Sequence, residues 1–174
     1  KVYSFNGKVN SASVNLGKAV LAGEEIPCVW KEDQIVNKPV TIGGKNYDIT
    51  LVNVGNPHCV VFSDKVDAVD VESVGPAIEN CDYFPERTNV EFVRVVNRVT
   101  IKMRVWERGT GETWSCGTGA AAAVVAAVLN GYCDRETNIT VKLRGGDLVV
   151  NWHENGDVEL TGNVKTVFEG SLEI

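Results

Sequence analysis

One cysteine lies in a sequence context that suits proton-transfer or nucleophilic chemistry. Cys116 precedes a Gly-Thr-Gly tripeptide, and residues 120–129 then form an unbroken apolar run of alanine, valine and leucine. Alanine has the highest helix propensity, so the run predicts a helix over about 117–130, with Thr118 capping its first turn. The free N–H groups and the dipole at a helix N-terminus stabilise a thiolate and hold an anionic ligand group. From this stretch alone, a buried structural cysteine is an equally good interpretation.

Two more polar residues lie around a turn in the middle of the chain. Asn56 belongs to a Gly-Asn-Pro turn between two strand-like runs, and His58 follows at the exit of that turn. Because successive strand residues face opposite sides, His58 and Cys59 are expected to point away from each other. Taken alone, a turn asparagine satisfies local backbone groups, and a strand histidine is hydrogen-bonded in the core.

A charged pair precedes the cysteine motif. Glu107 and Arg108 follow the strand predicted at 100–106 and lie nine and eight residues before Cys116. The glycine-containing loop between them and the cysteine allows the pair to fold back over the helix N-terminus. The ordinary interpretation of such a pair is the solvated start of a loop.

Most of the remaining chain predicts β-hairpins. Asn6-Gly7 and Gly43-Gly44 each separate two β-prone runs, and Asn-Gly is the strongest short-range hairpin signal. Val71, Val74 and Ile78 have the spacing of a short amphipathic helix. Strands are expected at 2–5, 9–16, 40–42, 47–54, 90–96, 100–106, 137–143, 147–153, 157–161 and 164–168.

The fold class follows from the apolar helix. A helix that is apolar on every face must be covered on all sides, and small alanine side chains let strands approach it closely. The 174 residues suffice for one domain with its own core. We therefore expect an α+β fold, a barrel of mainly antiparallel strands around the central helix at about 117–130.

The composition narrows the class of protein. A net charge of −6, with no Lys/Arg cluster beyond pairs, argues against nucleic-acid and anionic-membrane partners. No signal-peptide pattern or membrane-spanning run is present, so a cytoplasmic protein with free thiols is expected. The five cysteines include no Cys-x-x-Cys pair, which argues against a metal site. His153 is expected to be exposed beside a turn and is given no role.

Three motifs taken together resemble the carboxy-terminal half of diaminopimelate epimerase. They are Asn-Pro-His-Cys at 56–59, Phe-Pro-x-Arg-x-Asn at 84–89 and ERGTGETWSCGTGA at 107–120. The third motif is highly specific, and the other two have the right order and spacing. The fold implied by the resemblance consists of two pseudo-symmetric barrels, each around a central helix, with the active site between them.

The resemblance implies an isomerase that interconverts LL- and meso-2,6-diaminopimelate without a cofactor, in lysine and peptidoglycan precursor synthesis. Inverting a stereocentre needs one group to remove the α-proton and another to return a proton on the opposite face, and cysteine suits both tasks. The family pattern gives catalytic roles to Cys116, His58 and Glu107. The substrate-binding positions it implies are Asn56, Asn89, Glu107, Arg108, Gly117 and Thr118.

One departure from the family pattern concerns the second acid/base group. The family's other catalytic cysteine lies in a Cys-Gly-Asn-Gly motif of the amino-terminal half, and this sequence has no such motif. We therefore expect residues 1–17 to be the end of the amino-terminal half and residues 18–174 to form the carboxy-terminal epimerase domain. The chain alone is expected to be an inactive half-enzyme whose partners are an amino-acid substrate, the missing amino-terminal half and, as a further candidate, a second copy in a homodimer.

Two other functions fit parts of the sequence. A proline-racemase-like isomerase shares the Cys-Gly-Thr-Gly helix start, although the Glu107-Arg108 pair and the Gly-Glu-Thr segment favour diaminopimelate. A non-catalytic module that binds an amino-acid carboxylate at the helix terminus would have much the same sequence. The gene region upstream of Lys1 distinguishes the module from an epimerase half, because only the latter has a Cys-Gly-Asn-Gly segment there.

Overall fold

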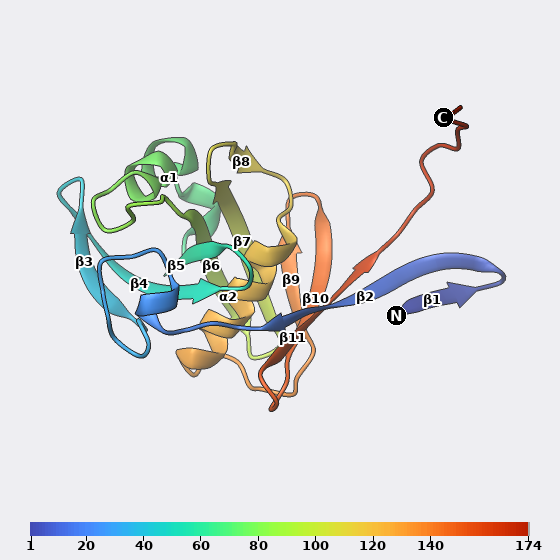
Figure 1. Cartoon of the computed structure of the whole chain (residues 1–174), viewed down its shortest axis with the longest axis horizontal. Helices are drawn as coiled ribbons and strands as arrows, with labels where there is room; N and C mark the ends of the chain where they lie inside the picture. The colour runs from blue at the N-terminus through green and yellow to red at the C-terminus, as the bar shows by residue number, and fades with distance from the viewer. Residues whose placement is uncertain (174) are drawn as a thin grey trace.

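The secondary structure follows the sequence pattern through most of the chain. The computed structural model describes residues 1–173 and has the elements shown in Figure 1. Its helices are η1 (Gly23–Glu25), η2 (Val66–Ala68), α1 (Val71–Glu79) and α2 (Gly117–Leu129). Its strands are β1 (Val2–Phe5), β2 (Lys8–Lys18), β3 (Lys38–Ile42), β4 (Lys45–Asn53), β5 (Pro57–Phe62), β6 (Asn89–Asn97), β7 (Thr100–Glu107), β8 (Gly111–Thr113), β9 (Ile139–Leu143), β10 (Gly146–Trp152) and β11 (Asp157–Asn163).

Two hairpins form at the turns that the sequence predicts. Asn6 and Gly7 join β1 to β2 with φ of 51° and 74°. Gly43 and Gly44 join β3 to β4 with φ of 57° and 77°. Positive φ at both central residues belongs to the tight turn whose twist matches that of the strands, and asparagine and glycine adopt it at little cost. Both hairpin predictions are confirmed.

All the strands within residues 1–173 belong to one mixed sheet. Neighbouring strands follow the order β1-β2-β11-β10-β9-β7-β6-β5-β4-β3, and β8 pairs with β7. The pairs β5–β6 and β7–β9 are parallel, and the others are antiparallel. An isolated bridge of two N–H···O bonds, 2.8 and 2.9 Å long, joins Val20 after β2 to Asn53 at the end of β4. The sheet is therefore mainly antiparallel, as predicted.

Helix α2 is covered along most of its length. Residues 120–127 are fully buried, and the helix packs against β4, β5, β6, β7, β9, β10 and β11. Burial on every side explains why this stretch lacks the alternation of polar and apolar residues that marks a surface helix. With 13 residues it is too short for a bilayer, and no helix within residues 1–173 is long and apolar enough to span one.

Strands β5 and β6 have one apolar cluster on each face. Val60 and Val93 pack in the cluster around α2, whereas Cys59 and Phe92 pack in a second cluster with residues of α1. Side chains alternate between the two faces of a strand. His58 has the parity of Val60 and therefore lies on the α2 side, away from Cys59, as the sequence predicts.

The end of the chain differs from the prediction. The sequence predicts a strand at 164–168, but β11 ends at Asn163 and residues 164–173 form neither helix nor strand. Val167 and Phe168 are 86% and 84% exposed, so their apolar side chains have no packing partner that would stabilise a strand. Figure 1 shows this segment and the β1–β2 hairpin both extending away from the rest of the molecule.

Candidate active site

Cys116 occupies the N-cap position of α2. Its backbone is extended, with φ of −135° and ψ of 114°, and its Sγ accepts the N–H of Gly119 at 3.3 Å. The hydroxyl of Thr118 lies 3.6 Å from the same sulfur. The prediction that Thr118 caps the helix is wrong, because Thr118 is already inside the first turn and the sulfur of Cys116 reaches the free N–H instead.

Burial decides the protonation of the Cys116 thiol. The residue is 8% exposed, and the loss of hydration raises its pKa above the ordinary value. Hydrogen bonds from Thr118 and the Gly119 N–H act in the opposite direction, whereas the charges of Glu91 and Glu107 raise this pKa further. The prediction of a thiolate stabilised by the helix N-terminus is therefore wrong for this state, in which the neutral thiol is favoured.

His58 lies between a buried carboxylate and an amide. Its Nδ1 is 2.7 Å from Glu91 Oε1, and its Nε2 is 2.9 Å from Asn56 Oδ1. The side chains of His58 and Glu91 are both fully buried. The parallel pairing of β5 with β6 sets His58 opposite Asn89, so Glu91 follows two residues later on the same face. Burial raises the pKa of Glu91, and the nearby His58 opposes that rise.

Glu91 is absent from the residues that the sequence analysis selected. The available signal is its position within Val90–Val93, where it is the one charged residue in a strand segment that is otherwise apolar. Glutamate is almost never fully buried unless it is paired. A charged residue at the centre of a buried strand therefore indicates a partner, although the sequence does not identify which residue that partner is.

Asn89 connects the two loops that carry other predicted site residues. Its Nδ2 donates to Pro57 O at 2.8 Å, and its Oδ1 accepts the N–H of Arg108 at 2.9 Å. Its side chain is buried. These bonds tie the turn before His58 to the loop after β7, and one Nδ2 hydrogen remains for a ligand.

Glu107 and Arg108 are half-buried at the end of β7. The Thr113 hydroxyl on β8 donates to Glu107 Oε1, and Arg108 Nη1 donates to Glu86 O at 3.0 Å. The charge of Glu107 raises the pKa of Cys116. The other N–H groups of the Arg108 fork suit a carboxylate ligand.

A second buried carboxylate holds the loop that contains Glu107. Glu79, in the last turn of α1, accepts the Nε1–H of Trp106 at 2.6 Å, the N–H of Gly109 at 2.9 Å and Nη1 of Arg87 at 3.3 Å. A carboxylate near a helix C-terminus opposes the helix dipole. Its position there is the only local signal for Glu79, which the sequence analysis missed.

Glycine is required where α2 begins. A Cβ on Gly119 would lie 2.8 Å from Glu91 Oε1 and 3.2 Å from Cys116 Sγ, so the carboxylate and the thiol both face this point of the helix. Gly117 and Thr118 are half-buried at the same terminus. Contacts join His58 to Asn56, Asn89 to Arg108 and Cys116 to Thr118, and Gly119 lies between Glu91 and Cys116. Glu107 and Gly117 are the chain neighbours of Arg108 and Cys116.

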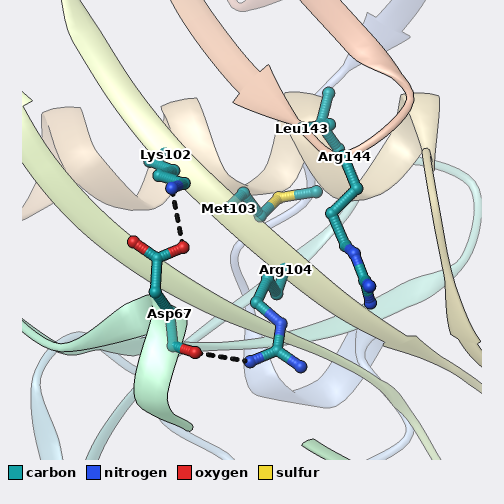
Figure 2. A pocket seen from close by; sticks show the side chains of 6 residues that line it. All are labelled: Asp67, Lys102, Met103, Arg104, Leu143 and Arg144. Atoms are coloured by element: carbon teal, nitrogen blue, oxygen red, sulfur yellow. Dashed lines mark hydrogen bonds and ion pairs between the residues drawn. The ribbon is translucent and has the colours of Figure 1, made fainter.

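A separate hollow of about 390 Å³ lies between η2, β7 and the end of β9. Figure 2 shows Asp67, Lys102, Arg104 and Arg144 around it. Lys102 pairs with Asp67 at 2.6 Å, and Arg104 and Arg144 pair with Glu112 at 2.8 and 3.1 Å. Both arginines share the single carboxylate of Glu112, and no predicted site residue lines the hollow. Within residues 1–173, no three His, Cys, Asp or Glu side chains are grouped to hold a metal ion.

The fold is that of a class of racemase structures. The chain superposes on a probable proline racemase from Agrobacterium radiobacter K84, solved with bound carbonate, with a TM-score of 0.66. The match covers 93% of this chain and 53% of that chain at 12% sequence identity. At this identity the likeness shows the shared fold.

Sequence comparison identifies the family. The family model described as diaminopimelate epimerase matches residues 50–167. Two relatives, from Leptospira biflexa and Acetivibrio thermocellus, bear that name, and each is 46% identical to this chain over 170 residues. The chain belongs to the diaminopimelate epimerase family, which confirms the resemblance seen in the motifs. In both matches 97% of this chain aligns, and it spans about 60% of the relative's length.

Proposed function

We propose that this chain supplies one side of the active site of a cofactor-independent epimerase that interconverts LL- and meso-2,6-diaminopimelate. Cys116 is one of its two acid/base groups. The observation that carries the proposal is the position of Cys116 Sγ, at the N-cap of α2 and bonded to the Gly119 N–H, in a chain of this family.

The chemistry is a pair of proton transfers at one carbon. A thiolate on one face takes the α-proton, so that a C–H bond breaks, an S–H bond forms and the electron pair stays on the α-carbon. A thiol on the other face then gives its proton to that carbon. Cys116 is favoured as the neutral thiol, so this state suits the donating step. The second thiol is proposed to come from an amino-terminal half.

The substrate groups have matching partners in the site. N–H groups of Gly117 and Thr118 at the start of α2 are suited to the carboxylate next to the reacting carbon, where they stabilise developing negative charge. Arg108 is proposed to hold the distal carboxylate with its planar fork. Glu107 and His58 are proposed to orient the substrate ammonium group and to influence thiol protonation.

Several structural features are part of the same proposal. We propose that the sheet closes as a barrel around α2, supported by the Val20–Asn53 bridge and by the contacts of α2 with strands from β4 to β11. Residues 1–17 are proposed to end an amino-terminal half and residues 18–174 to form the carboxy-terminal domain. A homodimer and a cytoplasmic location remain predictions.

The test uses a chimera that joins these 174 residues to an amino-terminal half taken from the Leptospira biflexa relative. Incubation with LL-2,6-diaminopimelate in deuterium oxide should give the meso form and incorporate deuterium at the α-carbon. Replacing Cys116 with serine should lower turnover by about 10²–10⁴-fold, the usual contribution of a positioned acid or base. The 174 residues alone should give no conversion.

The matched control is Cys133→Ser. Cys133 is also buried in the α2 cluster but makes none of the contacts of the site, so this variant should keep its turnover. Full turnover in Cys116→Ser, or by residues 1–174 alone, would remove the two-thiol mechanism. Conversion of proline but not of diaminopimelate by the chimera would favour the proline-racemase-like alternative, and binding without conversion would favour a non-catalytic module.

A further inference from the structure

Three polar side chains form a hydrogen-bonded series that ends at the surface of the site. Glu91 Oε1 meets His58 Nδ1, and His58 Nε2 meets Asn56 Oδ1, at 2.7 and 2.9 Å. Glu91 and His58 are fully buried, whereas Asn56 is partly exposed. Within residues 1–173, the NH2 group of Asn56 has no hydrogen-bond partner, so it is available to a ligand.

The acceptors of the Glu91–His58–Asn56 series determine how many hydrogens its two contacts need. The amide oxygen of Asn56 can only accept, and an ionised Glu91 can only accept. A neutral imidazole between them has a single N–H and can satisfy just one of the two contacts. Both contacts are satisfied when the His58–Glu91 pair holds one additional proton, either on the imidazole or on the carboxyl group. In both cases His58 Nε2 carries a hydrogen.

Burial favours the additional proton for a separate reason. With it the pair has no net charge, whereas without it a negative charge lies unbalanced in the core. Glu91 Oε2 is also buried without a hydrogen-bond partner, which is unfavourable for an ionised carboxylate. The titratable groups whose charges interact with Glu91 are His58 and Cys59 of β5, Glu107 of β7 and Cys116 before α2, and His58 is the one that forms a hydrogen bond with it.

We propose that Glu91 is a positioning residue that shares one proton with His58, and that this proton turns the NH2 group of Asn56 towards a ligand carboxylate. Removing the proton leaves Nε2 bare, and the Asn56 amide then reverses so that its NH2 group donates to His58. The reversed amide presents an oxygen to the site and repels a carboxylate. The state of a buried pair therefore selects which substrate group Asn56 binds; the identity of that substrate rests on the proposed function.

The first test measures the hydrogen on His58 directly. Long-range ¹H–¹⁵N spectra of the labelled chain at pH 7 distinguish a hydrogen-bearing Nε2 from a bare one. The sequence has two histidines, so His153→Asn assigns the signals. We expect Nε2 of His58 to carry hydrogen. A bare Nε2 with hydrogen on Nδ1 alone would overturn the proposal, and this result is independent of any enzymatic activity.

The second test uses Glu91→Gln, which imitates a protonated carboxyl group with an amide that can donate to Nδ1. This variant should keep the hydrogen on Nε2 at every pH at which it is folded, whereas the wild-type signal should disappear as the pH rises. In the chimera, the Michaelis constant for LL-2,6-diaminopimelate should rise about tenfold over the same pH range in the wild type and stay constant in Glu91→Gln.

The outcomes separate this inference from the proposed function. The same pH dependence in Glu91→Gln and in the wild type would show that Glu91 only packs in the core. A chimera without epimerase activity would remove the proposed function, while the spectra would still decide the position of the proton.

Discussion

Two histidine–glutamate pairs in this protein have similar contacts but different surroundings. Nδ1 of His58 lies 2.7 Å from Glu91, and Nδ1 of His153 lies 3.1 Å from Glu136. The first pair is fully buried between β5 and β6, whereas the side chains of His153 and Glu136 are 32% and 48% exposed. His153 is thus only partly exposed, and its contact with Glu136 lies outside the candidate site.

The pKa values of the two carboxylates move in opposite directions. Burial raises the pKa of Glu91 even though His58 is in contact with it. The backbone N–H of Glu154, followed by the His153 side chain, lowers the pKa of Glu136. In the core the loss of water outweighs the attraction of the histidine, and at the surface it does not. The hydration of a close His–Glu contact therefore decides in which direction the pKa of its carboxyl group moves.

The largest expected difference between the pairs is in stability. His58→Leu should lower the free energy of unfolding by about 3 kcal/mol, because it leaves a buried carboxyl group without its partner. His153→Leu should have a much smaller effect, because water replaces the lost contact. Urea denaturation at pH 7 measures both changes, and equal losses would contradict the distinction between the pairs.

The second-largest expected difference between the pairs is in how the free energy of unfolding depends on pH. The folded-state pKa of Glu91 is raised, so the folded protein binds this proton more tightly than the unfolded chain does. The stabilisation is complete below the unfolded pKa and is lost as the pH rises through the folded pKa. Glu91→Gln should remove this decline from the curve of unfolding free energy against pH, and an unchanged curve would show that Glu91 does not titrate in that range.

The exposed pair should show the opposite pH dependence, with a smaller amplitude. The folded-state pKa of Glu136 is lowered, so its stabilisation is present above the unfolded pKa and is lost as the pH falls through the folded pKa. Glu136→Gln should therefore flatten only the acidic end of the same stability curve. An unchanged acidic end in this variant would contradict the lowered pKa of Glu136.

The smallest expected difference is in how the pKa values of Glu136 and Glu91 respond to salt. Raising the ionic strength from about 0.05 to about 0.5 M screens exposed charges but affects buried ones much less. The pKa of Glu136 should therefore rise towards its ordinary value while that of Glu91 stays constant, as followed by carboxyl ¹³C signals. An equal response of both groups would mean that water reaches the buried pair.

Local sequence signals predicted much of the fold. The alanine-rich run fixed the position of α2, because helix propensity and uniform apolarity act within a single segment. Asn6-Gly7 fixed a hairpin for the same reason, since positive φ is a property of the turn residues themselves. Local apolarity was misleading at Val167 and Phe168, because a strand also needs a neighbouring strand, and the backbone pairing with β2 ends at Val164, whose N–H donates to Asn10 O.

The contacts and electrostatics of the candidate site could not be predicted from local sequence. The glycines around Cys116 marked the helix start, and the motif resemblance supplied the other positions. The pairing of His58 with Glu91 depends on the parallel register of β5 and β6, which joins residues 33 positions apart and leaves no mark in either segment. The pKa of Cys116 was predicted with the wrong sign because the burial of the thiol depends on the whole fold.

The burial of the middle of α2 also has an evolutionary consequence. Residues 120–127 are fully buried, so a larger side chain there would overpack the core at a cost of about 1–3 kcal/mol. The turn that carries Asn56 and the loop that carries Arg108 are not enclosed in this way, because both residues are partly exposed. Lineages that diverge towards new substrates should therefore accumulate change in these loops and inherit the helix almost unaltered.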